Sequence, residues 1–362
     1  MKIAQIAPLM ESCPPKLYGG TERVVSNLTE ELVRLGHEVT LFASGDSRTA
    51  AKLEPCCAGA LRLDPRCKDP LVYVMTMLYC VRRRAHQFDI LHFHTDYLHF
   101  PLFADVCDKT VTTMHGRLDM PDLPVAMREF SMMPLVSISD AQRRPMPWAN
   151  WHSTVLHGLP PHLHRLGNGS GGYLAFLGRI SPEKRPDRAI AIARRCGMPL
   201  QIAAKVDRVD REYHETEIAP LLDDPLVEFL GEIGEADKNV FLGNAAALLF
   251  PIDWPEPFGL VMIEAMAVGT PIIAFGCGSV PEIIEDGVTG FVVNDIDAAV
   301  DAVRHAVRLD RRMVRRRFEE RFTASRMASD YVRLYKSLLP VAAERRALRL
   351  VSASESDAAA VQ

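Results

Sequence analysis

The chain has 362 residues, more than the usual size of one domain, so its length predicts two domains with a cleft between them. Hydrophobic residues make up 48% of the sequence and charged residues 24%, a balance typical of globular proteins. The formal net charge of -4 provides no field that would attract a nucleic acid, so we expect no nucleic-acid partner.

The opening residues and the cysteines indicate the compartment. Residues 1–8 lack the long apolar core of a signal peptide, and no apolar run reaches the ~18 residues that a membrane span needs. The 8 cysteines include no CxxC pair, which disfavours a zinc site or a redox dithiol. We therefore expect a cytoplasmic protein with reduced thiols and no metal site.

The first half alternates between segments of strand length and helical patterns. Strands are predicted over residues 3–8, 38–43, 90–94, 111–114 and 135–138, and helices over residues 22–35 and 71–86. Such an alternation is typical of βαβ units around a parallel sheet. We expect a first Rossmann-like domain over residues 1–160.

A segment rich in glycine and proline, residues 161–172, predicts a linker, and the alternation then restarts. Strands are predicted over residues 173–177, 200–204, 227–230, 247–250 and 271–275, and helices over residues 187–195, 258–268 and 297–307. This pattern predicts a second Rossmann-like domain over residues 173–325. Residues 313–339 read as one continuous helix, and residues 351–362 are small and polar, which favours disorder.

The strongest functional signal is a predicted strand-to-helix turn, residues 253–271, with two glutamates eight positions apart. A helix that starts near Phe258 places Glu264 inside it and Glu256 on the preceding loop, where exposed N–H groups and the helix dipole attract an anion. Carboxylates bind vicinal hydroxyls well, so the pair suits a sugar and a ribose beside a phosphate.

This turn resembles glycosyltransferase family 4, whose hallmark is a pair of glutamates separated by seven residues and followed by Gly-Thr-Pro. The resemblance extends to residues 18–22, 176–186 and 278–290. It implies the GT-B fold, in which two Rossmann-like, doubly wound parallel-sheet domains face each other across a cleft. It further implies that a terminal helix, over residues 326–345, packs back on the N-terminal domain.

The resemblance also implies residue roles in the C-terminal, donor-binding domain. Glu256 is expected to contact the donor sugar and Glu264 the ribose. The main-chain amides around Phe258, Gly259 and Leu260 are expected to bind the donor phosphates.

Five further site residues follow from the same resemblance. Arg179 and Lys184 are expected to neutralise the leaving diphosphate without a metal ion. Gly19 and Gly20 let the backbone of the first domain approach the phosphates, and His115 is expected to position the sugar. No cofactor is expected beyond the nucleotide sugar, which is a co-substrate.

Two other patterns leave alternatives open. His92 and His94 alternate along a strand, but one further acidic neighbour is too few to favour a metal site. The arginines of residues 82–84 and 311–321 could touch acidic lipid, although a solvated helix face is the more ordinary interpretation. A weak peripheral membrane contact therefore remains an alternative.

These observations predict a retaining, metal-independent hexosyltransferase that uses a nucleotide-diphosphate sugar, with a UDP-sugar favoured. Its acceptor is a glycan, a lipid or a small molecule, bound by loops such as residues 44–70 and 115–130. The alternatives are a non-catalytic nucleotide-sugar-binding protein and a nucleotide-sugar epimerase of the same fold. An epimerase needs acid and base residues across the sugar, and the complete glutamate pair argues against it.

Overall fold

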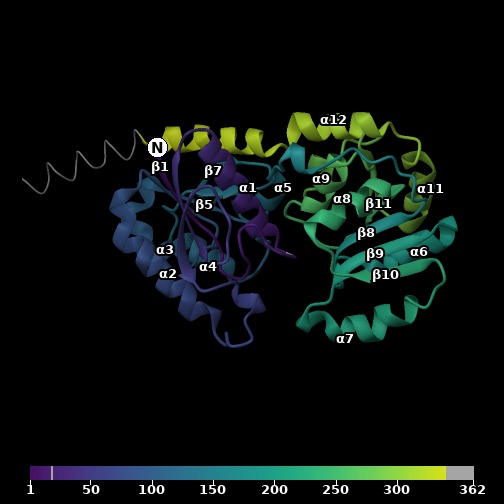
Figure 1. The fold of residues 1–362 in the computed structure, drawn as a ribbon, viewed down its shortest axis with the longest axis horizontal. Coiled ribbons are helices and arrows are strands. Elements are labelled where there is room, and N and C mark those ends of the chain that lie inside the picture. The colour runs from purple at the N-terminus through teal and green to yellow at the C-terminus, as the bar shows by residue number, and fades with distance from the viewer. Residues whose placement is uncertain (18, 340–362) are drawn as a thin grey trace, which may run out of the picture.

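Two parallel sheets organise the chain in the computed structural model, which describes residues 1–17 and 19–339 (Figure 1). The seven-stranded sheet has the order β3-β2-β1-β4-β5-β6-β7, and the six-stranded sheet has the order β10-β9-β8-β11-β12-β13. In each sheet the chain winds outward from a central strand in both directions, which is the doubly wound topology. The expected GT-B fold class is confirmed.

The first sheet contains all strands up to the linker: β1 (Lys2–Ile6), β2 (Glu38–Ser44), β3 (Lys52–Cys57), β4 (Ile90–Phe93), β5 (Thr110–Thr113), β6 (Leu135–Ser137) and β7 (Trp151–Thr154). Its helices are α1 (Gly20–Arg34), α2 (Pro70–Arg84), α3 (Phe100–Phe103), α4 (Leu123–Glu129) and α5 (Asp140–Arg143). Strands β4 and β5 are buried along their whole length because helices cover both faces of the sheet.

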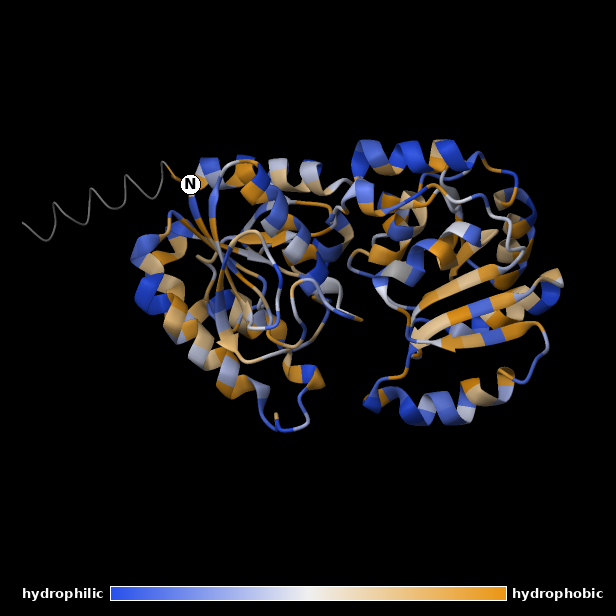
Figure 2. Cartoon of the chain, viewed as in Figure 1, coloured by the Kyte–Doolittle hydropathy of each residue, from blue (hydrophilic) through white to orange (hydrophobic). Residues whose placement is uncertain are grey.

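The second sheet consists of β8 (Leu174–Arg179), β9 (Leu200–Lys205), β10 (Val227–Gly231), β11 (Ala247–Phe250), β12 (Ile272–Phe275) and β13 (Gly290–Val293). Its helices are α6 (Pro186–Cys196), α7 (Arg211–Tyr213), α8 (Glu235–Asn244), α9 (Leu260–Ala267), α10 (Val280–Ile283), α11 (Ile296–Ala306) and α12 (Arg311–Arg321). Figure 2 shows apolar strands inside both domains and hydrophilic surfaces on outer helices such as α12.

The sequence patterns missed three strands, β3, β7 and β13. Each lies at an edge of its sheet, and neither β3 nor β7 contains a buried residue. Edge strands bury less apolar surface than central ones, so their alternation is weak. In β3 the internal Pro55 weakens the pattern further, since proline cannot donate to a sheet.

The predicted helix over residues 313–339 is wrong in its middle. Helix α12 ends at Arg321, and a separate helix spans residues 324–339. At the break, Leu159 N donates to Phe322 O over 2.9 Å, and Ala324 N donates to Leu159 O over 2.9 Å. Pairing with the linker therefore replaces the helical hydrogen bonds, a long-range effect that a local pattern does not contain.

Helix 324–339 packs against the first sheet, and its buried face joins the core around Ile3 and Val24. In Figure 1 it is the yellow helix that lies along the N-terminal domain. Residues 340–345 of the expected terminal helix and the predicted disordered tail, residues 351–362, lie outside the described residues. Among the described residues no helix is both long and apolar enough to cross a membrane.

Two arginines of α12 bind main-chain carbonyls of the linker and its surroundings. Arg311 donates to the carbonyls of Gly167, Gly243 and Ala245 over 2.9 to 3.1 Å. Arg315 donates to Pro161 O over 3.0 Å and to His164 O over 2.9 Å. These two guanidinium groups therefore hold the linker on the second domain. The sequence had suggested only lipid contact or a solvated helix face for these arginines.

The buried histidines of the first domain predict a pH-dependent stability. Burial lowers the pKa of His92, His94, His99 and His157 well below the value of about 6.5 in an unfolded chain. As the pH falls through 6.5, the unfolded chain therefore binds more protons than the folded one. We expect each histidine to lower the free energy of unfolding by about 0.7 kcal/mol between pH 7 and pH 6, measured by thermal melting.

Two variants test whether the buried histidines cause this pH dependence. His99 stacks on Phe93 with 3.8 Å between ring centroids, so His99→Phe keeps an aromatic ring there and removes one titrating group. That variant should reduce the change in the free energy of unfolding between pH 7 and pH 6 by about 0.7 kcal/mol, the contribution of one histidine. The exposed His305 on α11 provides the control, and His305→Gln should retain all of it. Equal pH dependence in His99→Phe and the unaltered protein would contradict this explanation.

Candidate active site

A cavity of about 320 Å³ lies between the carboxyl ends of the two sheets, where open α/β sheets bind ligands. Residues of both domains line it. The first domain contributes Leu17, Gly19, Gly20, Thr21, Arg23, Ile138, His115 and His157. The second contributes Lys184, Lys238, Glu256, Phe258, Gly259, Leu260, Val261 and Glu264, among others.

Two helices begin at this cavity from opposite domains. Helix α1 starts at Gly20 and α9 at Leu260, and a Cβ placed on Gly20 would lie 3.4 Å from Leu260 Cδ1. The first N–H groups of a helix have no partner within it, and the dipole adds partial positive charge. The cavity between these helix ends is therefore suited to an anion.

The loop before α9 holds Glu256 in the cavity wall with 8% of its surface exposed. Its carboxylate forms an ion pair with Lys184 and accepts a hydrogen bond of 3.0 Å from Trp254 Nε1. The predicted start of α9 was two residues early because Gly259, with a φ of 79°, is its N-cap. As expected, Glu256 lies on the loop and Glu264 inside the helix.

Glu264 is 5% exposed and pairs with Lys238 Nζ on α8 at 2.7 Å. Burial alone would raise the pKa of Glu264, but Lys238 and Arg23 outweigh burial and hold this pKa below its usual value. Arg23 itself, on the first turn of α1, forms an ion pair with Glu235 of the second domain. This contact joins the two domains beside Glu264.

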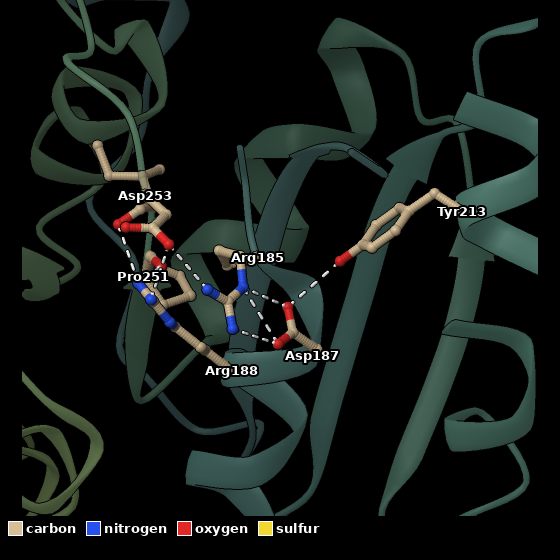
Figure 3. Close-up of polar contacts among 7 residues, drawn as sticks. Arg185, Asp187, Arg188, Tyr213, Pro251 and Asp253 are labelled. Carbon is tan, nitrogen blue, oxygen red and sulfur yellow. Dashed lines mark hydrogen bonds and ion pairs between the residues drawn. The ribbon is translucent and has the colours of Figure 1, made fainter. Parts of the chain in front are cut away.

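The loop that carries Lys184 is fixed to the loop that carries Glu256. Asp253 Oδ2 accepts from Arg185 Nη1 and from Arg188 Nη2, both over 2.9 Å (Figure 3). Asp253 N also donates to Glu183 O over 2.8 Å. Arg185 also binds Asp187 through two nitrogens. These bonds hold Lys184 and Glu256 in place before any ligand arrives.

Arg179 is the predicted site residue that the structure places apart from the others. It does not line the cavity, and its guanidinium faces Glu183 at 3.1 Å, Asp210 at 3.3 Å and Asp207 at 3.7 Å. Its charge is therefore already balanced. All nine other predicted residues line the cavity: Gly19, Gly20, His115, Lys184, Glu256, Phe258, Gly259, Leu260 and Glu264.

His115 follows β5, and its ring stacks on His157 with 5.3 Å between centroids. His157 in turn packs edge-on against Phe258 of the second domain at 4.8 Å. Burial lowers the pKa of His115 to about 3, so its ring is neutral at pH 7. Within residues 1–17 and 19–339 no cluster of three or more histidines, cysteines or carboxylates is arranged to hold a metal ion.

Two family profiles together match the chain from residue 18 to residue 322. The profile described as Glycosyltransferase Family 4 matches residues 18–192, and that of Glycosyl transferases group 1 matches residues 167–322. This chain belongs to glycosyltransferase family 4. The profiles meet at the junction between the two domains, so each domain of this family 4 protein has its own match.

Curated relatives match a shorter segment. D-inositol 3-phosphate glycosyltransferase of Mycolicibacterium smegmatis is 33% identical over 136 residues, which cover 34% of this chain and 29% of the relative. The protein of the same name from Salinispora arenicola is 35% identical over 154 residues, covering 38% and 33%. The matched segments thus span about a third of these relatives.

Solved structures match almost the whole chain. AviGT4, a glycosyltransferase involved in avilamycin A biosynthesis, superimposes with a TM-score of 0.70 at 25% identity and covers 94% of this chain and 98% of its own. HepE of Anabaena, solved with UDP and glucose, has a TM-score of 0.72 at 18% identity, covering 93% and 100%. The second likeness supports the fold alone.

Arg23, Lys238 and His157 are among the cavity residues of this family 4 protein that sequence reasoning missed. Arg23 lies within the predicted helix over residues 22–35, and its place three residues after Gly20 turns it toward the cleft. His157 lies near the end of the first domain, and its contact with Phe258 forms only on folding. For Lys238 we find no signal in the sequence, because its partner Glu264 lies on a different helix.

Gly278 supports the Glu256 loop by lacking a side chain. A Cβ on Gly278 would lie 2.3 Å from Glu256 O, and the φ of Gly278 is 61°. Gly287 has a similar φ of 72° but open space around it. We expect Gly287→Ala to cost about 1 kcal/mol from backbone strain, and Gly278→Ala at least about twice as much because of the added clash.

Denaturant unfolding of the two variants measures this difference. Tryptophan fluorescence should also change in the folded state of Gly278→Ala, because Trp254 lies on the displaced loop, and stay unchanged in Gly287→Ala. Equal destabilisation with equal spectra would show that Gly278 does not support the loop.

Proposed function

We propose that this family 4 protein is a retaining glycosyltransferase that transfers a hexose from a nucleotide-diphosphate sugar, with UDP as the favoured nucleotide. The observation that carries the proposal is that two buried carboxylates, Glu256 and Glu264, line the same cavity as the N-termini of helices α1 and α9. Sugar and ribose hydroxyls match the carboxylates, and a diphosphate matches the helix ends. The HepE complex with UDP supports UDP as the first nucleotide to test.

Binding of the donor would exchange ionic partners in the cavity. Lys184 pairs with Glu256 in the structure and lies 4.9 Å from the centre of the Trp254 ring. When sugar hydroxyls occupy Glu256, the released ammonium group can bind the diphosphate. Lys238 likewise yields Glu264 to the ribose. Arg179 would join the diphosphate only by leaving its three carboxylate neighbours.

In the proposed reaction the acceptor hydroxyl attacks the anomeric carbon from the face that the diphosphate leaves. The bond from the anomeric carbon to the phosphate oxygen breaks, and a bond to the acceptor oxygen forms. The acceptor proton passes to the departing phosphate oxygen. Configuration is thereby retained, and no protein nucleophile is needed. Lys184 and the two helix ends stabilise the negative charge that develops on the diphosphate.

We place the acceptor in a second hollow of about 590 Å³ on the first domain. It lies directly beyond His115, because Met114 and Gly116 belong to its lining. Its wall is mainly apolar, and the carboxylates of Asp96 and Glu129 lie among the lining residues. This lining suits an acceptor with an apolar body and hydroxyl groups.

The two glutamates should separate nucleotide binding from sugar transfer. We expect Glu264→Gln to abolish the rise in melting temperature that UDP produces in the unaltered protein, because the ribose contact is lost. Glu256→Gln should keep that rise but lower UDP-glucose hydrolysis and transfer about 100-fold or more. Melting curves and product assays measure the two effects.

Asp301→Asn, which changes an exposed carboxylate on α11, is the matched control and should behave as the unaltered protein. Near-normal turnover in Glu256→Gln would sink the assignment of the sugar site. A UDP-induced shift without turnover on any acceptor would instead favour a non-catalytic nucleotide-sugar-binding protein.

We further propose that the reaction needs no metal ion and no cofactor, because Lys184 and the helix N-termini supply the positive charge at the diphosphate. Incubation with EDTA followed by desalting should leave at least about 80% of the hydrolysis rate, since no charge at the site is removed. A complete loss that Mg²⁺ or Mn²⁺ reverses would overturn this part of the proposal.

A further inference from the structure

A chain of hydrogen bonds connects the cavity wall with the C-terminal helix. It runs from His115 through His94 and Gln5 to Tyr335 on helix 324–339. His115 Nε2 lies 2.8 Å from His94 Nδ1, and His94 Nε2 lies 2.8 Å from Gln5 Oε1. Gln5 Nε2 donates to the Tyr335 hydroxyl over 3.2 Å. Gln5, His94 and Tyr335 are at most 2% exposed, so water does not compete for these bonds.

The chain of hydrogen bonds continues beyond Tyr335. The Tyr335 hydroxyl lies 2.7 Å from His92 Nδ1, and His92 Nε2 lies 2.7 Å from Thr113 Oγ1. Thr113 Oγ1 lies 2.8 Å from the Tyr331 hydroxyl. With the amide nitrogen of Gln5 donating to Tyr335, every group in this series can donate to the next and accept from the one before. The orientation of the Gln5 amide in the structure is compatible with every bond of this series, and turning the amide over would reverse all of them.

That orientation determines where the protons lie on the two histidines nearer the cavity. The amide oxygen of Gln5 can only accept, so His94 Nε2 carries a proton. Burial, reinforced by the neighbouring histidines, lowers the pKa of His94 well below its usual value, and the ring is neutral. A neutral imidazole has one N–H, so His94 Nδ1 is bare and accepts from His115 Nε2.

The same reasoning applies to His115. Its Nε2 carries the proton that is donated to His94, and its ring is neutral because burial lowers its pKa to about 3. Its Nδ1 is therefore bare. Among the described residues no donor reaches this atom, although the ring lines the cavity. Stacking on His157 further restrains the ring.

We propose that Gln5 and His94 are positioning residues that fix His115 as its Nε2–H tautomer, so that His115 offers the substrate a hydrogen-bond acceptor. This inference rests on the proposed function and deepens it. The group recognised by His115 Nδ1 is a hydroxyl of the donor sugar that donates its proton. A group without a proton at that place would face the nitrogen lone pair and be rejected.

The tautomer can be measured without any assay of activity. In protein labelled with ¹⁵N-histidine, long-range ¹H–¹⁵N correlation spectra distinguish a bare ring nitrogen from a protonated one. The His115 signals are assigned by their absence in His115→Ala. We expect a protonated Nε2 and a bare Nδ1 at pH 7. A protonated Nδ1 in the unaltered protein would overturn the proposal, since it requires the opposite direction of every bond in the chain.

Gln5→Met tests the chain itself. Methionine has a similar length and no amide, so His94 loses the acceptor that fixes its tautomer, and His115 should become a mixture of both tautomers. Tyr331→Phe is the matched control, because it removes a buried hydroxyl from the same helix that the path to His115 does not use. A single unchanged His115 tautomer in folded Gln5→Met would refute the positioning role. If Gln5→Met does not fold, the spectrum of the unaltered protein still decides the tautomer.

Fluorinated donors test the recognition of a hydroxyl. Fluorine replaces a hydroxyl at similar size but cannot donate a hydrogen bond. Among UDP-glucose analogues with one sugar hydroxyl replaced by fluorine, those that lose a hydroxyl bound by Glu256 should bind more weakly whether or not His115 is present. We expect one further analogue to bind about fivefold to tenfold more weakly than UDP-glucose. In His115→Ala the difference for that analogue alone should disappear. Equal affinities of all analogues for the unaltered protein would overturn the hydroxyl assignment.

These measurements separate the failure of this inference from the failure of the proposed function. Absence of UDP-glucose binding would count against the proposed donor, while the spectra would still report the tautomer. Normal UDP-glucose binding with a protonated His115 Nδ1 would leave the proposed function intact and refute only the role of Gln5 and His94.

Discussion

Glu256 and Glu264 carry negative charge into a cleft wall where each keeps less than a tenth of its surface exposed. A buried carboxylate is costly unless a cation or several donors satisfy it. Each glutamate therefore has a lysine, Lys184 for Glu256 and Lys238 for Glu264. The loop after β8 and helix α8, which bring these lysines within reach, are consequently part of the site.

The same pairing explains how a charged ligand could enter without leaving a charge unsatisfied. Sugar and ribose hydroxyls can replace the lysines on the two carboxylates, while the lysines and the helix ends of α1 and α9 take up the phosphates. Each ion then exchanges one partner for another, so little charge is left unpaired during binding. The ligand's own binding energy does not have to compensate for a bare carboxylate.

Some features of the fold and of the site could be predicted from the sequence, and others could not. The glutamate pair, the turn before α9 and the central strands could be predicted, because glycine punctuation and apolar runs are local signals. Lys238 could not, because only folding brings α8 beside α9. The break at Phe322 arises from pairing with Leu159, far away in the sequence.

The buried histidines show the same limit. Alternation along a strand placed His92 and His94 on one face, but that pattern contains no information about Gln5 or Tyr335. Their meeting depends on the register of β1 against β4, in which Gln5 is the partner of His92, and on the docking of helix 324–339. The hydrogen-bond chain that uses these residues is a property of the fold.

The tautomer of His115 matters because the site is divided between two domains. Gln5, His94 and Tyr335 all belong to the first domain or to the helix packed on it, whereas Glu256 and Phe258 belong to the second. The domains are joined by two chain crossings that pair with each other, Leu159 with Phe322 and Ala324. A hinge motion there would carry the hydrogen-bond chain as one unit and leave its bonds intact. The acceptor nitrogen of His115 is thus set by the first domain and the helix packed on it, while a sugar held by Glu256 would be positioned by the second domain. Both domains would therefore be in place when His115 binds the sugar hydroxyl. A hydrogen bond formed at that stage can contribute to the reaction as well as to binding.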